Sequence, residues 1–274
     1  MDKIGKYEIK HFTKNRQNIV LILKEGKRKH NIHGLIEVDV TSGRNIIRDY
    51  KIKHNINISF TGWLIKCISQ AVSEHKIINT SRQGRRNTIS FDDVDIPIPV
   101  ERTINDDQIT MAYIIRKANT KSVLEITKEI RDIQKEKIDF KKQVLGENLT
   151  SFEKIILSSP LFVKKIAIYL ARKNALFRKK HIGTVGVTAI GMKGKFPGWA
   201  IPLSGATAST IVVGGINKKP GVVNNKIEIR EYLHLTITVD HDIVDGGPLA
   251  RFVDRLIELI ENNYGLEKNI INNL

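Results

Sequence analysis

Cysteine is almost absent from the sequence, and aromatic residues are scarce. Cys67 is the only cysteine among 274 residues, so the chain cannot form an internal disulfide. A lone thiol fits a reducing compartment, and we expect a cytoplasmic protein. Aromatic residues make up 6% of the chain and are not interleaved with its basic stretches, as they are in many nucleic-acid-binding segments.

Long hydrophobic runs are also missing. No apolar stretch is long enough to span a bilayer, and the start, Met1-Asp2-Lys3, lacks the apolar region of a signal peptide. We therefore predict no membrane partner. With 41% hydrophobic and 27% charged residues, the composition is that of a soluble globular protein with a sizeable core.

Acidic residues are outnumbered by basic ones, 29 against 45, which gives a net charge of +16. A field of this sign attracts polyanions, including nucleic acids and the phosphates of nucleotide cofactors. The basic residues are scattered, with small clusters at 24–30, 82–86 and 178–181, and no zinc-ligand spacing occurs. We predict no nucleic-acid partner and no metal, and we interpret the excess charge mostly as solvated surface.

Residues 231–260 predict a strand, a short turn and a helix. Apolar residues at 233, 235, 237 and 239 alternate with polar ones, which is typical of a strand with one buried face. Gly246-Gly247 end the turn, and Pro248 suits the first turn of a helix whose apolar residues recur at helical spacing as far as Ile260. His241 and Asp245 therefore lie on the strand-to-helix connection, four residues apart.

The position of His241 favours a chemical role. An isolated turn histidine usually makes one backbone hydrogen bond and nothing more. A histidine at a strand end, however, is held by rigid structure and still reaches a surface. Its ordinary pKa of about 6.5 suits proton transfer at neutral pH. The two glycines allow a ligand or another chain to approach the backbone closely.

The sequence around His241 resembles a motif of a known superfamily. Residues 241–246, HDIVDG, resemble the HxxxDG signature of coenzyme A-dependent acyltransferases. Residues 240–247 look most like the DHRxxDG block of the 2-oxo acid dehydrogenase dihydrolipoamide acyltransferases, with chloramphenicol acetyltransferase a more distant relative. Asp242 replaces the arginine usual after the histidine, so its role stays open.

Further stretches resemble the same family in order along the chain. They are residues 33–40, 60–79, 89–116, 119–133, 181–194 and 209–216. The resemblance places Thr188 on the serine or threonine whose hydroxyl stabilises the tetrahedral intermediate, although threonine is also an ordinary strand residue. It assigns Asp245 to fixing the turn or pairing with an arginine, for which Arg16 is a candidate. Departures from the family pattern at 107–108 and 111–112 leave the acyl group undetermined.

The resemblance implies an α/β fold: a two-layer sandwich with a mixed β-sheet covered by helices, chloramphenicol acetyltransferase-like. We expect a single acyltransferase catalytic domain over 1–274, with its core at about 12–260, and no lipoyl domain, subunit-binding domain or lipoyl lysine. The expected strands are 33–40, 89–100, 109–116, 185–188, 209–216 and 233–239. The expected helices start at 60 (capped by Ser59, with Cys67 in the core), 123, 160 and 248, while turns or loops are expected at 41–43, 101–108, 141–150 and 220–225, and a frayed tail at 262–274.

Three functions remain open at this point. The first is acyl transfer between coenzyme A, as a substrate, and dihydrolipoamide, with His241 as general base, Thr188 as oxyanion donor and a lipoyl domain as candidate partner. The second is a stand-alone acyltransferase for another small acceptor. The third is a catalytically silent scaffold subunit. The resemblance implies a homotrimer, or a larger assembly of trimers, in which His241 and Thr188 come from neighbouring subunits.

Overall fold

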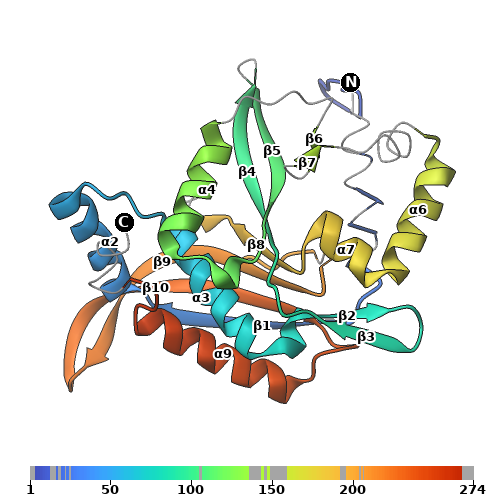
Figure 1. The fold of residues 1–274 in the computed structure, drawn as a ribbon. Helices are drawn as coiled ribbons and strands as arrows, with labels where there is room; N and C mark the ends of the chain where they lie inside the picture. The colour runs from blue at the N-terminus through green and yellow to red at the C-terminus, as the bar shows by residue number, and fades with distance from the viewer. Residues whose placement is uncertain are drawn as a thin grey trace.

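The structure, a computed structural model, describes residues 4–12, 17, 20–21, 23–24, 26–104, 107–135, 143–144, 147–148, 159–191, 196–203, 205 and 207–266. Strands and helices interleave along the chain (Figure 1). The strands are β1 (Asn31–Asp39), β2 (Thr80–Gln83), β3 (Asn87–Ser90), β4 (Ile96–Ile104), β5 (Asp107–Ile115), β6 (Gln143–Val144), β7 (Glu147–Asn148), β8 (Val185–Ala189), β9 (Ser209–Val223) and β10 (Lys226–Asp240). The helices are α2 (Thr41–His54), α3 (Phe60–Glu74), η1 (Lys76–Asn79), η2 (Ala118–Thr120), α4 (Val123–Lys135), α6 (Leu161–Lys173), α7 (Ala175–Ile182) and α9 (Gly246–Glu261).

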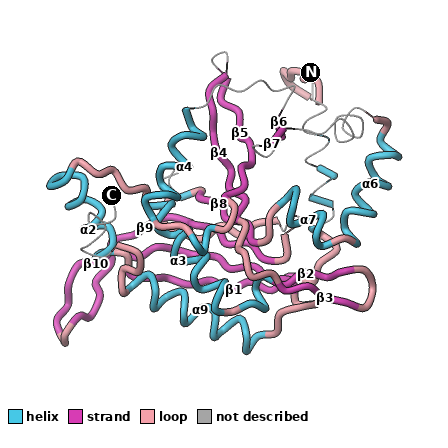
Figure 2. Tube along the Cα trace, in the orientation of Figure 1, coloured by secondary structure: helices cyan, strands magenta, loops and turns pink. Residues whose placement is uncertain are grey.

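A four-stranded mixed sheet forms the centre of the molecule. Its strand order is β1-β10-β9-β8; β10 runs antiparallel to both of its neighbours, whereas β8 runs parallel to β9. Helices α3 and α9 lie together along the sheet (Figures 1 and 2). The predicted two-layer α/β architecture, a mixed sheet covered by helices, is confirmed.

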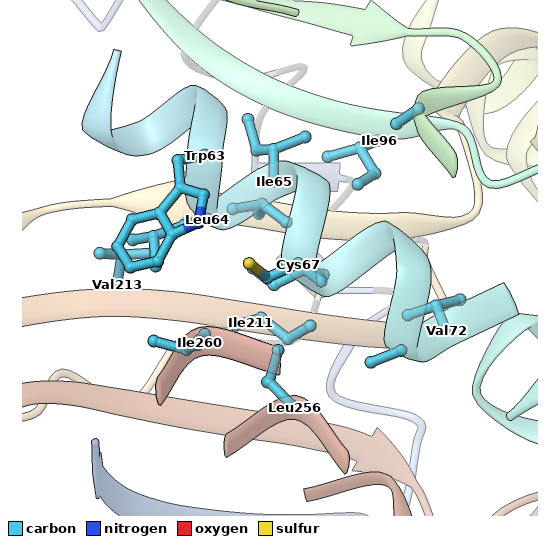
Figure 3. Packing of buried hydrophobic residues seen from close by; sticks show 14 of the residues in the cluster. Trp63, Leu64, Ile65, Cys67, Val72, Ile96, Ile211, Val213, Leu256 and Ile260 are labelled. Atoms are coloured by element: carbon cyan, nitrogen blue, oxygen red, sulfur yellow. The ribbon is translucent and has the colours of Figure 1, made fainter. Parts of the chain in front are cut away.

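Helix α3 supplies the centre of the core, as its apolar stripe predicts. Ser59 caps it, because its Oγ accepts a hydrogen bond from the Gly62 N–H at 3.2 Å. Trp63 and Cys67 are fully buried and face side chains of β9 and α9 (Figure 3). Burial raises the pKa of the Cys67 thiol, because a thiolate would lose its hydration there. Cys67 is therefore a core residue, as predicted.

The turn predicted at 220–225 is present but shorter than predicted. Strand β9 continues through Pro220 to Val223, and the turn is made by Asn224 and Asn225, with φ of 49° and 60°. Pro220 is tolerated because β8 pairs with β9 only from Ser209 to Val213, so the outer part of the hairpin has a free edge. Asparagine adopts positive φ more readily than most residues, which suits this tight turn.

The hairpin connection predicted at 101–108 is confirmed, but its turn is shorter than predicted. Strand β4 runs to Ile104 and β5 begins at Asp107, so Glu101 pairs with Thr110 inside the ladder. The far end of this hairpin projects away from the central sheet (Figure 1), whereas its base packs into the core through Ile96 and Ile115. The predicted strand over 89–100 divides into β3 and β4, with residues 91–95 unpaired between them.

Three local expectations fail for lack of tertiary information. The turn expected at 41–43 is the start of α2, helix α7 has no counterpart in the sequence prediction, and the loop expected at 141–150 contains the short strands β6 and β7. The tail expected to fray from residue 262 is ordered through Leu266, which is 3% exposed. The buried indole N–H of Trp63 donates to the Tyr264 carbonyl oxygen at 3.0 Å, and this bond ties the segment down. Residues 267–274 lie outside the described part.

Candidate active site

The turn that carries His241 is built by Asp240, the last residue of β10. The carbonyl oxygen of Asp240 accepts the N–H groups of Ile243 and Val244, both at 3.0 Å, and its carboxylate accepts the Asp242 N–H at 3.2 Å. Val244 is buried, so the turn is anchored from below. Helix α9 then begins at Gly246, two residues before the predicted start at Pro248.

His241 is fixed through its backbone while its ring stays accessible. Its N–H donates to the His30 carbonyl oxygen at 2.8 Å, and its side chain is 45% exposed. Nδ1 lies 3.6 Å from an Asp245 carboxylate oxygen, beyond hydrogen-bond length but within ion-pair distance. Asp245 is 82% exposed, so solvent weakens this attraction. The structure brings His241 and Asp245 together; Arg16 lies outside the described residues.

The Asp242 carboxylate contacts two basic side chains. One of its oxygens lies 2.8 Å from His30 Nδ1 and the other 3.1 Å from an Arg82 guanidinium nitrogen. The hydrogen bond with His30 lowers the pKa of Asp242 and raises the pKa of His30. The arginine expected from the family pattern is therefore replaced by a carboxylate that fastens the turn to the chain before β1 and to β2. No sequence signal pointed to His30 or Arg82 in this role.

Thr188 lies in β8, on the sheet face opposite the α3–α9 layer. It pairs with Val212 of β9, which pairs with Thr236 of β10, which pairs with Leu35 of β1. Cross-strand partners share a face, and their neighbours Val187, Ile211, Leu235 and Ile237 all belong to the helix-covered core. The predicted strand around Thr188 is confirmed, and its side chain is half-buried.

One protomer does not bring Thr188 and His241 together. Thr188 and Thr236 lie in the same row of the sheet, two strands apart. His241 comes five residues after Thr236, just past the end of β10. Strands lie about 4.8 Å apart and residues rise about 3.3 Å, so the offset is about 10 Å across the sheet and about 16 Å along it. A single active site that uses both groups therefore requires a second copy of the chain.

Two broader features of the described residues bear on function. None of the helices in this part of the chain is long and apolar enough to cross a bilayer. Within the same described ranges, no cluster of three or more histidine, cysteine or carboxylate side chains is placed to hold a metal ion.

A family model agrees with the residue-level resemblance. Residues 5–143 and 165–266 match the 2-oxoacid dehydrogenases acyltransferase (catalytic domain) model. The lipoamide acyltransferase component of the branched-chain alpha-keto acid dehydrogenase complex of Bacillus subtilis is 24% identical over 234 residues, which is 83% of this chain and 46% of that protein. The dihydrolipoyllysine-residue acetyltransferase component of the pyruvate dehydrogenase complex of Mycoplasma genitalium is 26% identical over 220 residues, 80% of this chain and 47% of that protein. The chain thus spans about half the length of these relatives.

Solved structures share the fold. The dihydrolipoamide acetyltransferase of Azotobacter vinelandii superposes with a TM-score of 0.69 at 17% identity, covering 97% of this chain and 96% of that one. The truncated catalytic core of the 2-oxoacid dehydrogenase multienzyme complex from Thermoplasma acidophilum gives a TM-score of 0.66 at 21% identity, covering 94% and 100%. Because the family model covers most of the sequence, the chain belongs to the 2-oxoacid dehydrogenase acyltransferase catalytic-domain family.

Proposed function

We propose that the chain transfers an acyl group between coenzyme A and a thiol acceptor such as dihydrolipoamide, with His241 as general base. The observation that carries the proposal is the half-exposed imidazole of His241 at the end of β10. Its backbone N–H is hydrogen-bonded to the His30 carbonyl oxygen, and Asp245 lies beside its Nδ1. Its support is membership of a family whose relatives are named as acyltransferase components of 2-oxo acid dehydrogenase complexes. A lipoyl domain is accordingly the proposed partner.

The proposed reaction needs one proton acceptor and one oxyanion donor. Since Nδ1 faces Asp245, we assign proton transfer to Nε2, which takes the proton from the attacking thiol. The thiolate attacks the thioester carbonyl, and the oxygen becomes negatively charged in a tetrahedral intermediate. When this intermediate collapses, the departing thiolate recovers the proton from the imidazolium. Asp245 lies beside Nδ1 and does not need to accept a proton.

Thr188 of a neighbouring copy is the proposed oxyanion donor. For the Azotobacter vinelandii enzyme, a serine, a histidine and an asparagine are named for their role in the catalytic mechanism. The asparagine follows the histidine by four residues. His241 and Asp245 have the same spacing, and Thr188 offers the same hydroxyl group as the serine. The proposed site would thus combine the general base of one chain with the oxyanion donor of another, because oxyanion stabilisation requires only correct placement.

The surface near Thr188 suits contact with such a copy. On or beside this side of the sheet several large apolar side chains are exposed to solvent: Leu35, Ile190, Phe196 and Trp199. Trp199 is held there, because its indole N–H donates to the Ile36 carbonyl oxygen at 2.9 Å and its ring packs edge-on against His234. Exposed apolar groups gathered in this way mark interaction surfaces. We propose that they form the contacts of a homotrimer.

The test is a thiol-release assay with acetyl-coenzyme A and dihydrolipoamide. We expect turnover by the wild-type protein, loss of turnover in His241→Ala, and a kcat lowered by about 10²–10³ in Thr188→Val, the usual loss for one oxyanion donor. Thr236→Val serves as the matched control, since Thr236 lies on the same face without facing the reacting atoms. Full activity in His241→Ala would refute the mechanism.

The other two functions predict different results in the same assay. Transfer only to acceptors other than dihydrolipoamide would identify a stand-alone acyltransferase. Binding of coenzyme A without any turnover, with intact folding shown by circular dichroism, would identify a scaffold subunit.

A further inference from the structure

A pocket of about 450 Å³ opens beside the turn that carries His241. Asp240, Asp242 and Ile243, which flank His241 in the sequence, form one wall. The turn between β2 and β3 and the facing helices α6 and α7 form the others. The volume is in the range of small-molecule sites, about 300–1,000 Å³.

The three basic clusters of the sequence meet at this pocket. Arg28 and Lys29 come from the first, Arg82 and Arg85 from the second, and Arg178 from the third. Helix α6 adds Arg172 and Lys173. Seven cations therefore line the pocket against two carboxylates, Asp240 and Asp242, which leaves an excess of five positive charges. Arg28, Arg82 and Arg85 are exposed, as the interpretation of these clusters as solvated surface expects, whereas Lys29 and Arg178 are partly buried.

The walls are held together by main-chain hydrogen bonds. The Gly84 N–H donates to the Lys173 carbonyl oxygen at 2.8 Å, and the Arg178 guanidinium donates to the Arg82 carbonyl oxygen at 2.7 Å. Lys29 Nζ donates to the carbonyl oxygens of Gly205, at 2.9 Å, and Thr207. Lys29 and Arg178 are thus held by the fold before any ligand binds, which reduces the entropy lost on binding.

We propose that this basic pocket binds the phosphate groups of a small-molecule ligand. Guanidinium groups recognise phosphate oxygens through paired, charge-assisted hydrogen bonds, and a ligand with several phosphates balances an excess of several charges. Tyr169, with Lys173 Nζ 4.3 Å from its ring centroid, supplies an aromatic wall, and Ile168 and Ile182 supply apolar ones. A phosphorylated ligand with a flat ring, such as a nucleotide, fits this lining.

The phosphates have two candidate sources. They are either the phosphates of coenzyme A or those of a phosphorylated acyl acceptor. This pair of candidates rests on the proposed function, whereas the binding of phosphate itself does not. Helix α6 begins at Leu161, between the two stretches that match the family model, 5–143 and 165–266.

The test measures binding of pyrophosphate and adenosine 3′,5′-bisphosphate by isothermal titration calorimetry. The variant is Arg85→Gln/Lys173→Gln, which removes two pocket cations without touching the His241 turn. The matched control is Arg131→Gln/Lys128→Gln, which removes one arginine and one lysine from the exposed side of α4. We expect the pocket variant to weaken binding by at least about tenfold, and the control to bind as the wild type does.

A competition experiment then identifies the source of the phosphate groups. If coenzyme A displaces pyrophosphate, and the pocket variant raises the KM for acetyl-coenzyme A but not for acetyl-pantetheine, which has no phosphate, the phosphates are those of coenzyme A. If coenzyme A binds without displacing pyrophosphate, they belong to a separate phosphorylated acceptor. Failure of both probes to bind the wild type, or equal weakening in the control, overturns the proposal. Binding does not depend on turnover, so a catalytically silent protein leaves this readout intact.

Discussion

Lys29 places an ammonium group inside the pocket beside the proposed active site. Burial lowers its pKa from 10.5 to about 8, an effect that Asp240 opposes and Arg178 reinforces. In the folded protein Lys29 is therefore mostly neutral between these two pH values, whereas in the unfolded chain it is still charged. The unfolded state then binds more protons, so the contribution of Lys29 to the free energy of unfolding rises with pH across this interval.

This sign gives a measurable prediction. Relative to Lys29→Met, the wild-type protein gains stability as pH is raised from about 8 to about 10.5, by at most about 3 kcal/mol. Urea unfolding of both proteins across this range checks it, with Lys128→Met as a control for loss of an exposed lysine. Parallel stability curves for wild type and Lys29→Met would contradict the shifted pKa.

The local sequence was enough to select His241, but not to identify the contacts of its neighbours. The spacing of His241 and Asp245 follows directly from the sequence, and the structure places them 3.6 Å apart. The hydrogen-bond partners of Asp242 could not be predicted from the sequence, because His30 and Arg82 are 212 and 160 residues away along the chain. A contact over such a separation exists only once β1, β2 and β10 have assembled.

At the scale of elements, α2 is fixed by its contact with α3. A β-carbon added at Gly43 would lie 2.2 Å from Cη2 of Trp63, which is fully buried. Gly43→Ala would raise helix propensity by about 0.5–1 kcal/mol, but the clash costs about 1–3 kcal/mol or more. We expect the clash to dominate and lower the free energy of unfolding.

Chemical denaturation of Gly43→Ala tests this, and Lys51→Ala is the control because Lys51 is an exposed residue of the same helix. The control is expected to change stability by no more than about 0.5 kcal/mol. A more stable Gly43→Ala would show that Trp63 can move and that propensity governs this helix.

The elements that periodicity predicted well are those with one clear apolar face. Strand β10 and helix α9 have this property, and so does α3 with its Ser59 cap. Helix α2 was missed because its mean composition is polar and only Gly43 and Tyr50 of its residues are buried. The extent of β9 was misjudged at Pro220, where proline suggested a turn but a free strand edge tolerated it.

At the scale of the whole molecule, the proposed site can be tested by mixing two inactive variants. His241→Ala keeps Thr188, and Thr188→Val keeps His241. If the two groups meet between copies, co-expressed variants form some interfaces in which both are wild type. Random assembly of a symmetric ring from equal amounts gives about a quarter of the wild-type activity.

Each variant expressed alone is the control and should retain only its own residual activity. Size-exclusion chromatography with light scattering must show the same oligomer for both. Absence of recovery in a mixed oligomer would show that the two groups do not act across copies.

The sequence by itself determined the strand, turn and helix around His241, the buried role of Cys67 and the family, because short-range periodicity and ordered motifs are local properties. The tertiary structure alone decided that three basic clusters from distant parts of the chain surround one pocket, and that Thr188 and His241 are separated within a protomer. Both depend on strand order and register, which bring remote residues together or keep them apart regardless of their spacing along the chain.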